Sequence, residues 1–174
     1  MQNLNYGVIG NCSTAALISE KGAIEWLCFP EFDSPSVFAA ILDRQKGGHF
    51  GFKVTSDYKV TQSYVPHTNI LSTHFESEEG AFDVVDFMPC YPTSDGKDFY
   101  RPAEIYRYIR WAKGRPRMKV DYRPAPNYAR GKTIYNVTSQ YVETYSSVEN
   151  KDRQYLYSSL DLKKVVNHDE ITLE

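Results

Sequence analysis

Hydrophobic and polar residues alternate in short segments along most of the chain, which indicates half-buried β-strands rather than helices. The first two segments flank Glu20-Lys21-Gly22, a connection short enough for a tight hairpin, in which Gly22 can adopt the positive φ required. The segments with this pattern cover residues 15–18, 23–28, 50–54, 58–64, 71–75, 82–85, 104–111, 119–123, 133–138, 140–145 and 154–160. They predict about ten strands and an all-β fold, a large antiparallel β-sandwich.

One segment breaks the alternation and predicts a short helix near residues 35–42. Pro30 and Pro35 each remove a backbone donor, so an irregular aromatic loop is expected from Phe29 to Pro35. Pro35 suits the first helical position, with Ser34 as the N-cap residue. Apolar residues then recur at helical spacing before two glycines end the element: Val37, Phe38, Ile41 and Leu42, followed by Gly47-Gly48.

The same region carries a resemblance to a known family. The matching residues are Gly7–Gly10, Ala15–Ile18, Gly22–Cys28, Phe32–Ala40 and Gly47-Gly48, with weaker matches at Thr68–Leu71, Thr73, Val85–Pro89, Glu104-Ile105, Gly114, Pro126, Tyr128 and Arg130. They resemble the start of bacterial proteins of glycoside hydrolase family 15, the glucoamylase, glucodextranase and trehalase-like enzymes. The resemblance implies an N-terminal β-sandwich of the super-sandwich type, which in that family precedes an (α/α)6 barrel whose two glutamates perform the hydrolysis.

The length of the chain agrees with a domain rather than a whole enzyme, because 174 residues cannot contain a sandwich and the barrel as well. We expect residues 1–174 to form a single N-terminal β-sandwich domain. A domain truncated at its C-terminal end is the open alternative. Val165-Val166 and Ile171–Leu173 look like further strand material with no stop signal after them. By resemblance, the parent protein is an inverting exo-α-glucosidase or a trehalase, while this chain alone is not expected to be an enzyme. The expected partner is the C-terminal catalytic barrel of the same polypeptide, which would bind an α-glucan oligosaccharide or trehalose.

Composition excludes several other classes of protein. A formal net charge of -2 with interspersed signs gives no attraction of the whole chain to nucleic acid or anionic lipid. No apolar run approaches the roughly 20 residues of a membrane span, and residues 1–10 lack the features of a secretory signal, so we expect a cytoplasmic protein. Residues 101–123 are locally basic with interleaved aromatics, a composition that also suits binding to single-stranded nucleic acid. Because these charges divide between both faces of the predicted strands, a solvated sheet face is the preferred interpretation.

The cysteines give no sign of a structural framework. Cys12, Cys28 and Cys90 are odd in number and show no ligand spacing with the histidines. We therefore expect no disulfide, no metal and no cofactor, and interpret the three residues as buried free thiols.

No residue of the chain is predicted to be catalytic. Inverting hydrolysis of a glycosidic bond needs two carboxylates roughly 6.5 to 9.5 Å apart on either side of the sugar. Asp83 and Asp86 are three apart in a predicted strand, so they should face opposite sides of the sheet. Glu31 and Asp33 share one loop, where a turn and a charge at the start of the predicted helix are the simpler interpretation.

The aromatic loop is the candidate for a subtler role, at the rim of the substrate pocket of the neighbouring barrel. The candidate residues are Phe29, Phe32, Asp33 and Ser34, together with Trp26. Aromatic faces beside a hydrogen-bonding carboxylate suit a sugar ring. The competing interpretations are that Trp26 belongs to the core, since it shares a strand face with Cys28, and that the loop only packs between domains. Two alternatives for the whole chain also stay open, a free-standing carbohydrate-binding β-sandwich and a purely structural domain.

Overall fold

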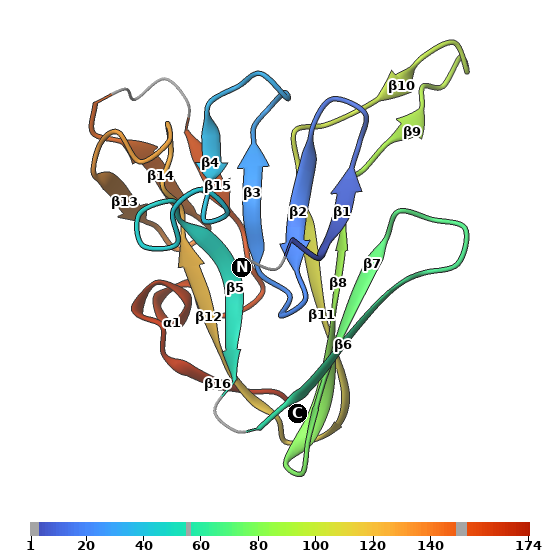
Figure 1. Cartoon of the computed structure of the whole chain (residues 1–174), viewed down its shortest axis with the longest axis vertical. Helices are drawn as coiled ribbons and strands as arrows, with labels where there is room; N and C mark the ends of the chain where they lie inside the picture. The colour runs from blue at the N-terminus through green and yellow to red at the C-terminus, as the bar shows by residue number, and fades with distance from the viewer. Residues whose placement is uncertain (1–3, 55–56, 149–152) are drawn as a thin grey trace.

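The computed structural model describes residues 4–54, 57–148 and 153–174. Within these residues the chain forms antiparallel strands and a single short helix, α1 (Leu162–Asn167). Two main sheets face each other (Figure 1), so the predicted all-β sandwich is confirmed.

The larger sheet, called sheet A here, has seven described strands in the order β1-β2-β3-β5-β12-β16, with β4 paired to β3. Its strands are β1 (Tyr6–Gly10), β2 (Ala15–Ser19), β3 (Ile24–Cys28), β4 (Ser36–Phe38), β5 (His49–Val54), β12 (Arg117–Arg123) and β16 (Glu170–Thr172). The predicted hairpin is present as β2 and β3, and Gly22 in its turn has φ +74°.

The second sheet, sheet B, has the described order β11-β8-β7-β6 and is drawn in green to yellow in Figure 1. Its strands are β6 (Lys59–Tyr64), β7 (Leu71–Ser77), β8 (Gly80–Phe87) and β11 (Tyr106–Gly114). A three-stranded sheet follows, made of β13 (Thr133–Val137), β14 (Val142–Ser146) and β15 (Gln154–Leu156), and a small hairpin, β9 (Tyr91–Pro92) with β10 (Phe99–Tyr100), projects from the body of the domain.

The core lies between the inner faces of sheets A and B. Along β2, Ala16 and Ile18 are fully buried whereas Leu17 is only half-buried, as the alternation in the sequence predicts. On the opposite sheet, the rings of Phe75 and Phe82 stack at a centroid distance of 4.7 Å. Burial of alternate residues from both sheets is therefore the main source of stability.

The predicted helix near residues 35–42 is wrong. Residues 36–38 form β4, which pairs with β3. The next three backbone N–H groups donate to carbonyls outside the segment: Ala39 to Gly47, Ala40 to Gly48 and Ile41 to Glu25. Residues 36–40 are all buried. A short one-sided helix would expose some of these positions to water, so a segment buried on all sides forms tertiary hydrogen bonds instead.

The C-terminal segment also differs from its strand-like sequence. Val165 lies in α1. Asp161 caps the N-terminus of this helix by accepting a hydrogen bond from the Lys163 N–H, and His168, with φ 57°, caps its C-terminus. Leu162 and Val165 form the buried side of this helix. The prediction holds only for β16, which pairs with β12 at the edge of sheet A.

Candidate functional site

The loop between β3 and β4 carries most of the predicted site residues and is held by hydrogen bonds within the loop and to the β1–β2 turn. Ser34 N–H donates to the Glu31 carbonyl at 3.1 Å, and Ser34 Oγ accepts from Glu31 N–H at 3.1 Å. Phe32 N–H donates to the carbonyl of Ser13 at 3.0 Å, which ties the loop to the β1–β2 turn. Ser34 therefore closes the loop rather than capping a helix, and the predicted role of Asp33 at a helix start is wrong.

The structure separates the five predicted rim residues into an exposed pair and three half-buried residues, one of which is Ser34. Phe32 is 64% exposed and Asp33 beside it is also exposed, so both side chains are available to a neighbour. Phe29 is half-buried and packs against the main core. Trp26 is half-buried opposite Leu17 on the outer face of sheet A, away from the core.

The interpretation of Trp26 as a core residue is wrong, and irregular pairing is the reason. Register shifts interrupt the β2–β3 ladder between Leu17 and Ile18 and the β3–β4 ladder between Leu27 and Cys28. Leu27 and Cys28 are consequently both buried, although neighbours in a regular strand face opposite sides. The simple alternation that placed Trp26 beside Cys28 in the core does not hold here.

A turn that sequence reasoning did not single out lies against the same end of β3. Asn127, Tyr128 and Ala129 have φ values of 56°, 53° and 56°, three consecutive non-glycine residues in the left-handed region. Such backbone is costly and is found mainly where the surrounding structure imposes it, often at functional sites. Neither Tyr128 nor Ala129 signals a positive φ in the sequence; only the family resemblance had marked Tyr128.

The left-handed turn and the residue two before it contact the strands on either side of the loop, β3 and β4. Tyr128 Oη lies 3.9 Å from Cys28 Sγ, and Ala125 N–H donates to the Val37 carbonyl at 2.9 Å. Burial raises the pKa of the Cys28 thiol, so this sulfur acts as a packed, neutral group. Of the three cysteines, Cys28 is buried as predicted, whereas Cys12 and Cys90 are exposed.

Asn11 organises the same end of the sandwich from the inside. Its side chain is 1% exposed and its Oδ1 accepts from the N–H groups of Ser13 and Thr14, each at 3.1 Å. Its Nδ2 donates to the carbonyl of Pro102 at 3.0 Å. Segments far apart in the sequence are thus fixed around the β3–β4 loop, which presents Phe32 and Asp33 on an ordered base.

The carboxylates that could suggest catalysis are ion-paired on opposite faces of β8. Asp83 accepts from His74 Nδ1 at 2.7 Å and from Arg110 Nη2 at 2.8 Å on the outer face. Although burial tends to raise the pKa of Asp83, these hydrogen bonds outweigh burial and hold the pKa below its ordinary value. Asp86 pairs with Arg107 on the inner face. The prediction that Asp83 and Asp86 diverge is confirmed.

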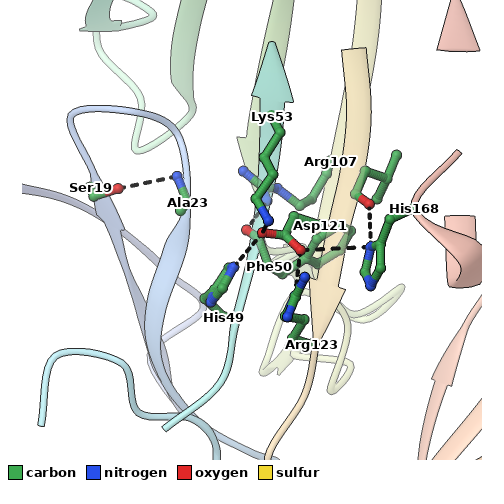
Figure 2. A network of polar contacts seen from close by, with 10 residues as sticks. Ser19, Ala23, His49, Phe50, Lys53, Arg107, Asp121, Arg123 and His168 are labelled. Atoms are coloured by element: carbon green, nitrogen blue, oxygen red, sulfur yellow. Dashed lines mark hydrogen bonds and ion pairs between the residues drawn. The ribbon is translucent and has the colours of Figure 1, made fainter. Parts of the chain in front are cut away.

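A further charged cluster surrounds Asp121 on the outer face of sheet A (Figure 2). Asp121 Oδ atoms accept from His49 Nε2 at 2.8 Å, Lys53 Nζ at 2.9 Å and Arg123 Nε at 2.6 Å, and His168 Nδ1 lies 3.6 Å away. Burial of Asp121 opposes ionisation, but the three hydrogen bonds prevail and hold its pKa far below the ordinary value. The cluster links β5, β12 and the end of α1.

The locally basic middle of the chain is largely used in ion pairs. The pairs are Arg101–Asp98, Arg107–Asp86, Arg110–Asp83, Lys113–Glu76, Arg115–Glu174, Arg117–Glu79, Arg117–Glu170 and Arg123–Asp121. Arg107 faces inward and Arg110 outward, as the mixed spacing of the charges indicated. Within the described ranges, no group of three or more metal-binding side chains could hold a metal ion. No helix in the described part of the chain is long and apolar enough to cross a membrane.

Comparison of the sequence with known proteins shows the family of this chain. Residues 5–150 match the family model described as "Trehalase-like, N-terminal". The chain is 36% identical over 132 residues to "Trehalase" of Thermoplasma volcanium, covering 74% of the chain and 20% of the relative. It is 33% identical over 155 residues to "Trehalase" of Thermoplasma acidophilum, covering 87% of the chain and 26% of the relative.

The similarity is also present over a shorter stretch in a third organism. Over 85 residues, 48% of the chain, the identity to "Trehalase 1" of Sulfolobus acidocaldarius is 51%, and the match covers 14% of that relative. No solved structure matches the chain. The matched region is thus about a quarter or less of each of these three relatives, and the chain belongs to the family of trehalase-like N-terminal domains.

Proposed function

We propose that this chain serves as the N-terminal β-sandwich domain of a trehalase or a related family 15 α-glucoside hydrolase. The observation that carries the proposal is the match of residues 5–150 to a trehalase-like N-terminal family, combined with relatives named trehalases of which the match covers only 20% and 26%. In this proposal residues 1–174 form one domain. Its partner is a C-terminal (α/α)6 catalytic barrel of the same polypeptide.

The domain itself has a non-catalytic role in this proposal. Asp83, Asp86 and Asp121, the most buried carboxylates, are each held by an arginine side chain: Arg110, Arg107 and Arg123 respectively. The pairing holds the pKa of Asp83 and of Asp121 below the ordinary value, which makes both poor general acids at neutral pH. Hydrolysis of trehalose or an α-glucan oligosaccharide therefore belongs to the barrel. A cytoplasmic location stays a prediction.

The β3–β4 loop is the part of the domain best suited to shape the entrance of the barrel's pocket. Phe32 and Asp33 are exposed on a loop whose backbone is fixed, and this combination gives an aromatic face and an acceptor in a defined position. Ser34 holds the loop closed, while Phe29 anchors it in the core. Trp26 does not form part of the rim in this proposal, because it lies on the outer face of sheet A.

The test is a pair of single substitutions in the full-length polypeptide, with trehalose as substrate. Asp33→Ala should lower kcat/KM at least about threefold, equivalent to about 0.7 kcal/mol, while changing the melting temperature by no more than about 2 °C. Glu78→Ala is the matched control, since Glu78 is an exposed carboxylate in the β7–β8 turn at the far end of the sandwich (Figure 1).

Two outcomes would contradict the proposal. If Asp33→Ala keeps wild-type kinetics, the loop serves interdomain packing only and the rim role is wrong. If the full-length polypeptide releases no glucose from trehalose or from maltooligosaccharides, the assignment to an α-glucoside hydrolase is wrong.

A further inference from the structure

Sheet B is too narrow to cover the inner face of sheet A. In the described residues, sheet B has four strands and ends at β11, which pairs with β8 along one edge. No described strand pairs with the other edge of β11. β5 and β12 of sheet A line a cleft together with β11, so part of the inner face of sheet A has no strand of sheet B against it.

A large cleft lies beside this unpaired edge. Its volume is about 910 Å³, and its walls include Phe50 and Phe52 of β5, Val120 and Tyr122 of β12, Ile109 of β11 and Leu156 of β15. Phe50, Phe52, Ile109 and Leu156 are only partly buried although they pack against the core clusters. The hydrophobic core is therefore open along one side of the sandwich, where core residues are usually covered on all sides.

The edge of β11 has the geometry of a strand that accepts a neighbour. From Tyr106 to Trp111 its ladder with β8 is regular, and the register shift comes only between Trp111 and Lys113. Natural edge strands are usually shortened, bulged or charged to prevent further pairing. β11 has nine residues. Its one inward-facing charge between Tyr106 and Trp111 is Arg107, which forms an ion pair with Asp86. Residues 106–111 are therefore neither short nor bulged, and their second charge, Arg110, is paired with Asp83 on the outer face, so the backbone edge of this stretch is open to a neighbour.

We propose that a further β-strand of the same polypeptide adds to the free edge of β11 and places alternate apolar side chains in the cleft. The added strand would be antiparallel, like every described pairing in the domain, and would cover Phe50, Phe52 and Tyr122. A strand of six residues spans roughly 20 Å, which matches the regular stretch of β11. Main-chain hydrogen bonds would fix its position, and the cleft would select apolar residues at every second position.

The choice of the same polypeptide as the source follows from the length of the relatives. The matched region covers only 20% and 26% of the two Thermoplasma trehalases, so most of such a polypeptide lies outside this chain. A second copy of the chain would extend sheet B through its own β11, whose inward face carries Arg107 as well as Ile109 and Trp111, so the cleft would receive a charged side chain among the apolar ones. The inference rests on the proposed function only in taking the chain as part of a longer polypeptide.

The test is amide hydrogen exchange, measured residue by residue on the full-length polypeptide. β6, the other edge strand of sheet B, provides the internal control. We expect every amide from Tyr106 to Trp111 to exchange at least about 100-fold more slowly than the alternate amides of β6 that point away from β7, in a sample that is monomeric by light scattering. Alternate β11 amides that exchange as fast as those of β6 would overturn the inference.

Oligomeric state and enzymatic activity, measured on the same sample, complete the test. If the polypeptide is a dimer and dilution to monomer exposes β11, the occupant is a second copy and the inference is wrong. Glucose release from trehalose separates this inference from the proposed function. Protected β11 amides in an inactive polypeptide would contradict only the proposed function. Exposed β11 amides in an active polypeptide would contradict only this inference.

Discussion

The guanidinium of Arg107 in β11 is buried against the carboxylate of Asp86 in β8, with Nε 2.8 Å from Oδ1 and Nη2 3.1 Å from Oδ2. The two side chains are 4% and 0% exposed. The same guanidinium donates to the carbonyls of Gly22 and Phe50 and lies 4.7 Å from the ring centroid of Phe50. One ion pair of sheet B therefore satisfies backbone groups of sheet A and joins the two sheets.

Replacing Arg107 should destabilise the domain strongly. Arg107→Met leaves the Asp86 carboxylate buried without its cation and removes the donors to two carbonyls, and breaking a buried pair in this way typically costs about 3–5 kcal/mol. The matched control is Arg110→Met, which removes an arginine from the outer face of the same strand, where its side chain is 61% exposed. That change should cost about 1 kcal/mol or less. The free energy of unfolding, measured in urea, gives both losses. Equal losses would contradict the role of Arg107 in joining the two sheets.

Two glycines with similar backbone but different surroundings allow a second test. Gly48 has φ +72°, and a Cβ there would lie 2.5 Å from the Arg123 carbonyl oxygen. Gly96 has φ +67° and no atom within 4 Å of the same position. Gly96→Ala should therefore cost only the backbone penalty of about 1–2 kcal/mol, and Gly48→Ala about 1–3 kcal/mol more because of the clash. Thermal unfolding of both variants measures the difference, and comparable melting temperatures would show that the Gly48 contact relaxes freely.

The Asp121 cluster should make stability depend on pH. Hydrogen bonds from His49, Lys53 and Arg123 hold the pKa of Asp121 below the ordinary value, despite the opposing effect of burial. An aspartate with a depressed folded pKa stabilises the fold above its unfolded pKa of about 3.9, and this contribution declines as the pH falls toward the folded value. Asp121→Asn should lose about 2 kcal/mol at pH 7.

The difference in unfolding free energy between wild type and Asp121→Asn should then shrink as the pH is lowered from roughly 5 to roughly 2.5. Denaturant unfolding at several pH values measures this difference. A difference that stays constant over this range would mean that the Asp121 carboxylate titrates alike in the folded and unfolded chain.

The sequence pattern predicted most of the strands because their burial follows simple alternation. β7 shows this well, since Leu71, Thr73 and Phe75 are buried while the residues between them are not. The hairpin at Gly22 was also readable, because a short turn between two apolar runs leaves few conformations.

The errors arise where tertiary contacts override local pattern. Val37 and Phe38 fit a helix by spacing, but Ser36–Phe38 pairs with β3 and is buried on all sides. Trp26 turns outward because of register shifts that leave no mark in the sequence. The left-handed turn at Tyr128 is equally invisible, since tyrosine seldom adopts positive φ. Exposure of Phe32 and Asp33 agrees with the predicted pocket rim, but their contact with substrate stays a prediction.

The aromatic half of the rim proposal can be tested with Phe32→Ala in the full-length polypeptide. Because Phe32 is 64% exposed, its replacement should cost far less stability than the roughly 3–5 kcal/mol typical of a core phenylalanine. Loss of a stacking face for the sugar should raise KM for trehalose more than it lowers kcat. Phe29→Ala is the contrasting variant from the same loop, because Phe29 packs against the core, and it should lower the melting temperature while leaving the kinetics of the folded molecules closer to wild type. If Phe32→Ala keeps the wild-type KM and instead destabilises the protein as much as Phe29→Ala, the ring packs against the neighbouring domain and does not contact substrate.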